Sequence, residues 1–194
     1  MDPRTSVSPG PEGLKALSHP GRLRMLGLLR EGPATATMLA TRLGLNSGAT
    51  SYHLRQLEKH GFIVEDTTRG NARDRWWRAA HHYTQADAAE ATTPEEHDTY
   101  DAYLQAVGVI YTEQLQHSLE ERRTLPPAWQ DAGNLSDWSL HLTPERAKAL
   151  VEALHELIEG WPEDPADTPG AASFRVNVNA FVRPGTLATE DVEP

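Results

Sequence analysis

Residues 38–62 read MLATRLGLNSGATSYHLRQLEKHGF, and this stretch decides the fold. Its first part predicts a short helix that starts after an N-cap at Thr35 and ends at Gly44. Its second part predicts a helix over residues 46–60 that stops before Gly61. Two helices joined by a turn of three residues, GLN, form the pattern of a helix-turn-helix.

The second helix carries small polar residues at its start and leucines later. Leu54 and Leu57 have the spacing of an inner face, which packs on the rest of the domain. The polar start is typical of a recognition helix, since short side chains let the backbone approach the major groove and can hydrogen-bond base edges or phosphates. The order of residues therefore favours a helix whose later turns pack on the domain and whose first turns enter the major groove.

A hairpin follows this helix directly. FIVED predicts one strand, TTRGNARD a polar turn and RWWRA the returning strand, so residues 62–79 are expected to form a wing. Adjacent residues of a strand face opposite sides, so only one of Trp76 and Trp77 can be buried. The wing is rich in arginine, which suits contact with a phosphate backbone or the minor groove; its arginines are Arg69, Arg73, Arg75 and Arg78.

Three segments, HPGRLRMLGLL, MLATRLGLNSGATSYHLRQLEKHGFI and RGNARDRWWRA, resemble the winged helix-turn-helix domain of ArsR-type transcriptional regulators. The resemblance covers about residues 12–83. It implies a homodimer that binds an operator in double-stranded DNA, with recognition helix 46–60 in the major groove and wing 62–79 on the backbone or in the minor groove. The expected DNA contacts are Asn46, Ser47, Thr50, Ser51, Tyr52 and Arg55 on the helix, and Arg69, Asn71, Arg73 and Arg75 on the wing.

The charge is divided unevenly along the chain. The 194 residues carry a net charge of −10. Residues 1–80, however, hold 12 lysines and arginines against 7 aspartates and glutamates, a net of +5, while residues 81–194 hold 6 against 21, a net of −15. The basic half is expected to bind the nucleic acid, which is a polyanion, and the acidic half is expected to serve another role.

Composition excludes several other classes. The chain has no cysteine, so disulfides, cysteine-ligated zinc, iron-sulfur clusters and thiol-based metalloid sensing are excluded. No apolar run is long enough to span a membrane, and no leader pattern opens the sequence, so a cytoplasmic protein is expected. No Walker loop, dinucleotide turn or nucleophile elbow is present, and the prediction is a protein that is not an enzyme and needs no cofactor.

The predicted fold class is α+β, mainly α. We expect a flexible arm over residues 1–13, the winged domain over 14–83, a connector and a long dimerisation helix over 84–123, and a small strand-helix-strand module over 124–194. Apolar residues of the long helix recur at steps of three and four. The predicted dimerisation residues are Tyr100, Leu104, Val107, Tyr111, Leu115 and Leu119.

The C-terminal module is expected to contain strands in LSDWSLHL (135–142) and FRVNVNAFV (174–182) around a helix from Pro144. Two strands and one helix are too small to be stable alone, so the module must pack on something. Reinforcement of the dimer, an effector pocket and a docking site for another protein are three open roles.

Two other functions stay open from the sequence. One is a winged-helix module that binds protein and has no affinity for DNA. The other is a metal-responsive regulator, for which His97 and His117 on the long helix are weak candidate ligands. They lie twenty residues apart, about 30 Å along a helix, so one helix cannot join them and a partner helix would be needed. An unidentified small-molecule effector is also compatible with the sequence.

Overall fold

The protein is described by a computed structural model over residues 5–69, 74–165 and 167–187. The chain divides into two units, residues 1–133 and 134–194. The elements of the first unit are β1 (Ser6–Val7), α1 (Pro11–Leu17), α2 (Pro20–Glu31), β2 (Ala34–Thr35), α3 (Ala36–Leu43), α4 (Ser47–Lys59), β3 (Ile63–Glu65), β4 (Trp76–Ala79), β5 (Tyr83–Thr84), η1 (Ala88–Glu90), α5 (Pro94–Glu121), η2 (Arg122–Thr124) and α6 (Pro127–Ala132).

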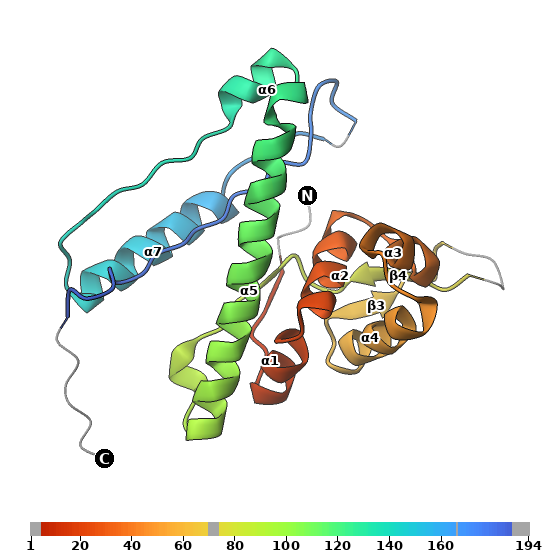
Figure 1. The fold of residues 1–194 in the computed structure, drawn as a ribbon, viewed down its shortest axis with the longest axis horizontal. Helices are drawn as coiled ribbons and strands as arrows, with labels where there is room; N and C mark the ends of the chain where they lie inside the picture. Colours follow the sequence, from red (N-terminus) through yellow and green to blue (C-terminus); the bar gives the residue numbers. More distant parts are fainter. Residues whose placement is uncertain (1–4, 70–73, 166, 188–194) are drawn as a thin grey trace. The chain divides into compact units, whose positions relative to one another are not determined.

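Helices α2, α3 and α4 and the sheet enclose the main core (Figure 1). Its largest fully buried apolar side chains come from every one of these parts of the sequence, which explains why the segments fold together. They are Leu17, Met25, Leu26, Leu39, Leu54, Leu57, Phe62 and Ile63. The two leucines predicted for the inner face of residues 46–60 are thus confirmed as core residues.

The turn between α3 and α4 has the predicted construction. Gly44 adopts a left-handed conformation with φ of 64°, and the amide of Leu45 donates to the Ala40 carbonyl at 2.9 Å. The side chain of Asn46 then caps α4, because its Oδ1 accepts from the Ala49 amide at 2.8 Å. A C-cap glycine followed two residues later by an N-cap asparagine holds the two helices in a tight turn.

The wing belongs to a three-stranded sheet in the order β2-β4-β3. Strand β4 is antiparallel to both neighbours, with Trp77 opposite Ala34 on one side and Glu65 on the other. Trp77 is buried and Trp76 is only half-buried, so the predicted alternation is confirmed. The short strand β2, just before α3, ties the wing to the start of the helix-turn-helix.

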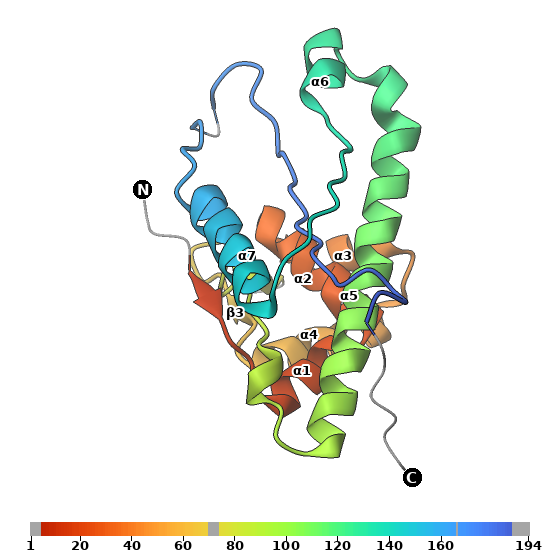
Figure 2. The ribbon, with the colours of Figure 1, turned by 90° about the vertical axis from the view of Figure 1, so that its left-hand side faces the viewer.

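Helix α5 begins with a capping box, in which Thr93 and Glu96 each accept from the other's backbone amide. It packs against α1 and α2, and buries Tyr103, Ala106 and Ile110 at steps of three and four. Figure 2 shows α5 alongside both helices. Although α5 has 28 residues, neither it nor any other described helix is apolar enough to cross a membrane.

Two sequence predictions about the first unit need correction. Residues 6–13 were expected in a flexible arm, but β1 pairs with β5 and α1 begins at Pro11. The pairing partner lies more than seventy residues away, so composition alone could not reveal it. Residues 127–132, expected as part of the C-terminal module, form α6 in the first unit.

In the second unit the predicted helix is confirmed as α7 (Pro144–Glu159), and Thr143 caps it by accepting from the Arg146 amide. The strands expected over 135–142 and 174–182 are not formed among the described residues. Figures 1 and 2 show both segments extended and running in the same direction, opposite to α7. Alternating residues indicate the two faces of a strand, whereas a strand also requires a hydrogen-bonded neighbour.

Candidate nucleic-acid interface

The outer face of α4 carries most of the residues predicted to contact DNA. Ser47, Ser51 and Arg55 follow one another at steps of four and therefore lie in one row. Tyr52 stands beside this row with 51% of its surface exposed. Leu54 and Leu57 anchor the helix in the core. Ser47, Tyr52 and Arg55 are exposed and Ser51 is half-buried, so the structure brings these four predicted residues together on the outer side of the helix.

Thr50 is an exception, and its prediction as a DNA contact is wrong for this structure. Its side chain is fully buried, and its hydroxyl donates to the Asn46 carbonyl at 3.0 Å. Thr50 lies four and seven residues before Leu54 and Leu57, so helical spacing places all three on the buried face of α4. It stabilises the start of the recognition helix from inside.

His53 faces the start of α2 and not the exposed row. Its ring lies 4.4 Å from the ring of His19, the N-cap residue of α2, measured between centroids. Burial lowers the pKa of His53, and the neighbouring His19 and Arg22 lower it further. His53 therefore contacts its own domain, away from the expected DNA contacts.

Asp66 shapes the beginning of the wing. Its buried carboxylate accepts from the Thr68 hydroxyl at 2.6 Å and from the Thr68 amide at 3.1 Å. These hydrogen bonds lower the pKa of Asp66, and Arg69, whose Nε lies 3.7 Å from the carboxylate, adds to the effect. An aspartate that binds the backbone two residues ahead is a turn former. Arg69 is thereby held at the edge of the wing, more than half exposed.

Arg75 is placed between the wing and α4. Its Nε donates to Glu65 at 2.6 Å and its Nη2 donates to Glu58 at 2.9 Å. The guanidinium also lies 4.3 Å from the centroid of the Trp77 ring. A planar cation between two carboxylates and an indole face is oriented by all three. The sequence predicted Arg75 only as a DNA contact and did not reveal these partners.

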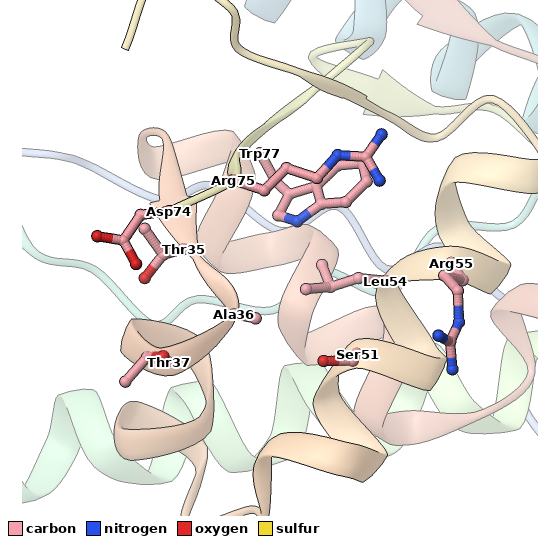
Figure 3. Close-up of a pocket in the computed structure, with 9 residues that line it drawn as sticks. All are labelled: Thr35, Ala36, Thr37, Ser51, Leu54, Arg55, Asp74, Arg75 and Trp77. Atoms are coloured by element: carbon pink, nitrogen blue, oxygen red, sulfur yellow. The ribbon is translucent and has the colours of Figure 1, made fainter. Parts of the chain in front are cut away.

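A groove of about 280 Å³ separates α4 from the base of the wing. Figure 3 shows Ser51 and Arg55 on one side and Thr37 and Asp74 on the other, with Arg75 above Trp77. The start of α3 opens into this groove through Ala36 and Thr37. Free amides at the start of α3 and the guanidinium of Arg55 favour an anion in this groove, whereas the Asp74 carboxylate disfavours one.

Two predicted wing contacts, Asn71 and Arg73, lie outside the described residues. The fourth wing arginine, Arg78, is exposed on β4. Among the predicted DNA contacts that are described, Asn46 is exposed but uses its side chain as a helix cap.

The predicted dimerisation residues divide into two groups. Tyr100 and Val107 pack against the core of their own chain. Leu104, Leu115 and Leu119 are exposed by 45%, 38% and 47%, and Tyr111 is half-buried beside them. The inner face of α5, with Tyr103 and Ile110, is a different face of the same helix. A second, apolar face therefore stays open, and Gly108 within it has open space around it.

The two histidines considered as metal ligands, His97 and His117, are both exposed on α5. Over the described part of the chain, no three histidine, aspartate or glutamate side chains are grouped so as to hold a metal ion.

Comparison with known proteins agrees with the fold. Residues 17–66 match a family described as a helix-turn-helix domain. This range covers α2, α3, α4 and β3, and includes every described α4 residue named above. These residues therefore form a helix-turn-helix domain.

Two relatives share this region. The HTH-type transcriptional regulator NmtR of Mycobacterium tuberculosis is 43% identical over 53 residues, which are 27% of this chain and 44% of that protein. The HTH-type transcriptional regulator YgaV of Escherichia coli is 45% identical over 51 residues, which are 26% of this chain and 52% of that protein. The chain thus covers about half the length of each relative.

A solved structure with a similar region is the homodimeric winged helix-turn-helix DNA-binding domain of Mb0332 from Mycobacterium bovis, described as a possible ArsR-family transcriptional regulator. It is 24% identical, with a TM-score of 0.34, and the match covers 55% of this chain and 81% of that one.

Proposed function

We propose that this chain, which carries an ArsR-like winged helix-turn-helix domain, is a homodimeric transcriptional regulator that binds operator DNA sequence-specifically and acts as a repressor. One observation carries the proposal: Ser47, Ser51, Tyr52 and Arg55 share the exposed face of α4 beside the wing. The function is binding and involves no catalytic step.

Base reading is assigned to the start of α4. Ser47 and Ser51 are short enough to let the helix enter the major groove and can donate to or accept from a base edge. Tyr52 offers a hydroxyl and a ring that can contact a thymine methyl group. Because α4 is anchored by Leu54 and Leu57, its exposed row keeps one orientation relative to the domain.

Phosphate contacts are assigned to the wing arginines and to the groove at the start of α3. Arg55 and Thr37 line opposite sides of this groove, which suits one phosphate between them. Contacts of this kind position the domain without selecting a sequence. Binding should weaken as salt rises, since each neutralised phosphate releases counterions.

Dimerisation is assigned to the exposed face of α5 defined by Leu104, Tyr111, Leu115 and Leu119. Its exposed apolar side chains suit contact with another apolar surface, and Gly108 permits close approach of a second helix. A two-fold dimer would present two α4 helices to two half-sites in successive turns of the major groove. A dimer seated on a promoter in this way represses by blocking access to it.

The test is a mobility shift with the full chain and the duplex upstream of its own coding region, against random duplex of equal length. We expect specific binding at least about a thousandfold tighter at moderate salt, which is the lower end of the usual range of specificity ratios. Arg55→Gln should weaken it, while Arg122→Gln, the same loss of charge at the end of α5, should not. Equal affinity for both duplexes would refute the proposal of sequence-specific operator binding and would favour a protein-binding module.

A further inference from the structure

We propose that Arg22 of α2 binds a phosphate of the DNA strand on the side of α4 that lies away from the wing. Arg55 binds the strand on the wing side, so the recognition helix is held by both backbones that border the major groove. The inference rests on the DNA binding of the proposed function, and it adds a contact from α2 to those of α4 and the wing.

The start of α2 packs against the side of α4 that carries His53. The ring of His53 lies 4.4 Å from the ring of His19, which caps α2. A methyl group at Gly21 would lie 3.8 Å from the Nε2 atom of His53. Burial lowers the pKa of His53, and His19 and then Arg22, the residue after Gly21, lower it further. Arg22 therefore lies on the α2 side of the recognition helix.

Arg22 and Arg55 lie on opposite sides of the exposed surface of α4. Successive residues of an α-helix are about 100° apart around its axis, so His53 and Arg55 are separated by about 200°. Arg55 lines the groove at the base of the wing (Figure 3), whereas His53 faces α2. Tyr52 lies between these two directions and is 51% exposed. One arginine thus borders each side of the surface that carries Tyr52.

The guanidinium of Arg22 is available for an anion. Within the described part of the chain, Arg22 forms no ion pair, and its buried Nε atom has no hydrogen-bond partner. Other arginines of the domain are paired with carboxylates; they include Arg24, Arg42 and Arg75. A buried donor without an acceptor is unfavourable, and a bound phosphate oxygen supplies the acceptor.

Tyr52 adds a second donor at the same place. Burial lowers the pKa of Arg22, and Tyr52 partly offsets this effect by raising it, which places the phenol oxygen near the guanidinium. Arginine stays charged at neutral pH even so. Guanidinium and hydroxyl groups are common donors to DNA phosphates. Because Arg22 is half-buried, its side chain has less freedom to lose when it binds.

The dimensions of the major groove suit a contact on each side. An α-helix with its side chains is about 10–12 Å across, and the major groove of B-DNA is about 12 Å wide. A helix that fills the groove therefore brings the residues on its two sides close to the two phosphate backbones. Arg55 meets one strand and Arg22 meets the other, while Tyr52 between them faces the base edges.

The salt dependence of DNA binding by the full-length protein tests the inference, with the operator duplex and a random duplex. Each phosphate contact contributes about 0.9 to the slope of log affinity against log salt concentration. Arg22→Gln should therefore make the slope shallower by about 0.9 per bound subunit, or about 1.8 for a dimer, on both duplexes. Arg22→Lys keeps the charge and should keep the slope. Arg24→Gln removes the same charge from the same helix, where Arg24 pairs with Glu113 of α5, and should keep the slope as well.

Unfolding by denaturant checks that Arg22→Gln is folded. Should it not fold, Arg22→Met takes its place, because methionine keeps an unbranched stem without the charge, and the same change of slope is expected. A purely structural role of Arg22 would lower affinity without changing the salt slope of the folded protein. An unchanged slope in the folded variant would therefore overturn the phosphate contact.

The outcomes distinguish this inference from the proposed function. A wild-type protein that prefers the operator, together with an unchanged slope in Arg22→Gln, would overturn the Arg22 contact alone. Equal affinity of the wild type for both duplexes, with a shallower slope in Arg22→Gln, would refute operator binding and support the contact. A wild-type protein with no affinity for either duplex would refute both.

Discussion

The guanidinium of Arg75 donates to the carboxylate of Glu58 at 2.9 Å, and this ion pair joins the wing to the recognition helix. Both side chains are partly exposed, so the pair contributes at most about 1 kcal/mol to stability. Its importance lies in position, since it fixes the wing relative to α4.

The first prediction concerns this pair. Arg75→Ala should lower operator affinity while changing the free energy of unfolding by less than about 1 kcal/mol. Glu58→Gln keeps every wing arginine and should also lower affinity if orientation matters. Affinity measured for both variants and for the double variant forms a cycle. Strictly additive losses would show that Arg75 acts on DNA without help from Glu58.

The second prediction separates residues that read the base sequence from residues that position the domain on the phosphate backbone. Ser51→Ala and Tyr52→Ala should change the preferred sequence, because their side chains lie where base edges are expected, at a cost of about 1–3 kcal/mol in discrimination. Arg73→Ala should weaken binding to all sequences alike. Binding selection from a random library measures both effects, and the same preference in all three variants would contradict this division.

The third prediction concerns Thr50. Thr50→Val keeps the shape of the buried side chain but removes the hydroxyl that donates to Asn46. We expect a loss of about 0.5–1.5 kcal/mol in the free energy of unfolding, the usual contribution of one hydrogen bond. Because the side chain does not reach the surface, the preferred DNA sequence should be unchanged. An altered sequence preference would show that Thr50 contributes to base recognition.

The fourth prediction concerns the dimer. Leu115→Glu places a charge in the exposed apolar face of α5 and should give a monomer by light scattering at micromolar concentration, with weaker operator binding. Gln116→Glu introduces the same charge one residue away, outside that face, and should leave the dimer intact. Should Leu115→Glu remain dimeric, the interface must lie elsewhere.

The fifth prediction concerns pH. The folded pKa of His53 is lowered below its ordinary value of 6.5, so the unfolded chain takes up a proton first as pH falls. The folded state therefore loses stability from about pH 6.5 downward until His53 is protonated in both states. Denaturant melts between pH 5 and 8 should show a shallower decline for His53→Gln than for the wild type. His97→Gln changes an exposed histidine of α5, serves as the control and should behave like the wild type.

The sequence by itself determined the local architecture of the winged domain. The apolar spacing within residues 38–62, the left-handed glycine at position 44 and the alternation of Trp76 and Trp77 depend on a residue and its near neighbours. The ends of the helices and the location of the wing follow from them. The outer residues Ser47, Ser51, Tyr52 and Arg55 could be named only from the resemblance to ArsR-type regulators, because Ser51 lies three residues before Leu54 and spacing alone does not place it on the outer face.

The tertiary structure decided what depends on distant parts of the chain. Arg75 is held by carboxylates from two other elements, Glu58 of α4 and Glu65 of β3. β1 exists only because β5 pairs with it. Likewise, alternation could mark the faces of residues 135–142 and 174–182, but a strand also requires a hydrogen-bonded neighbour, which alternation does not specify. Spacing encodes which face a residue prefers, whereas packing determines what that face meets.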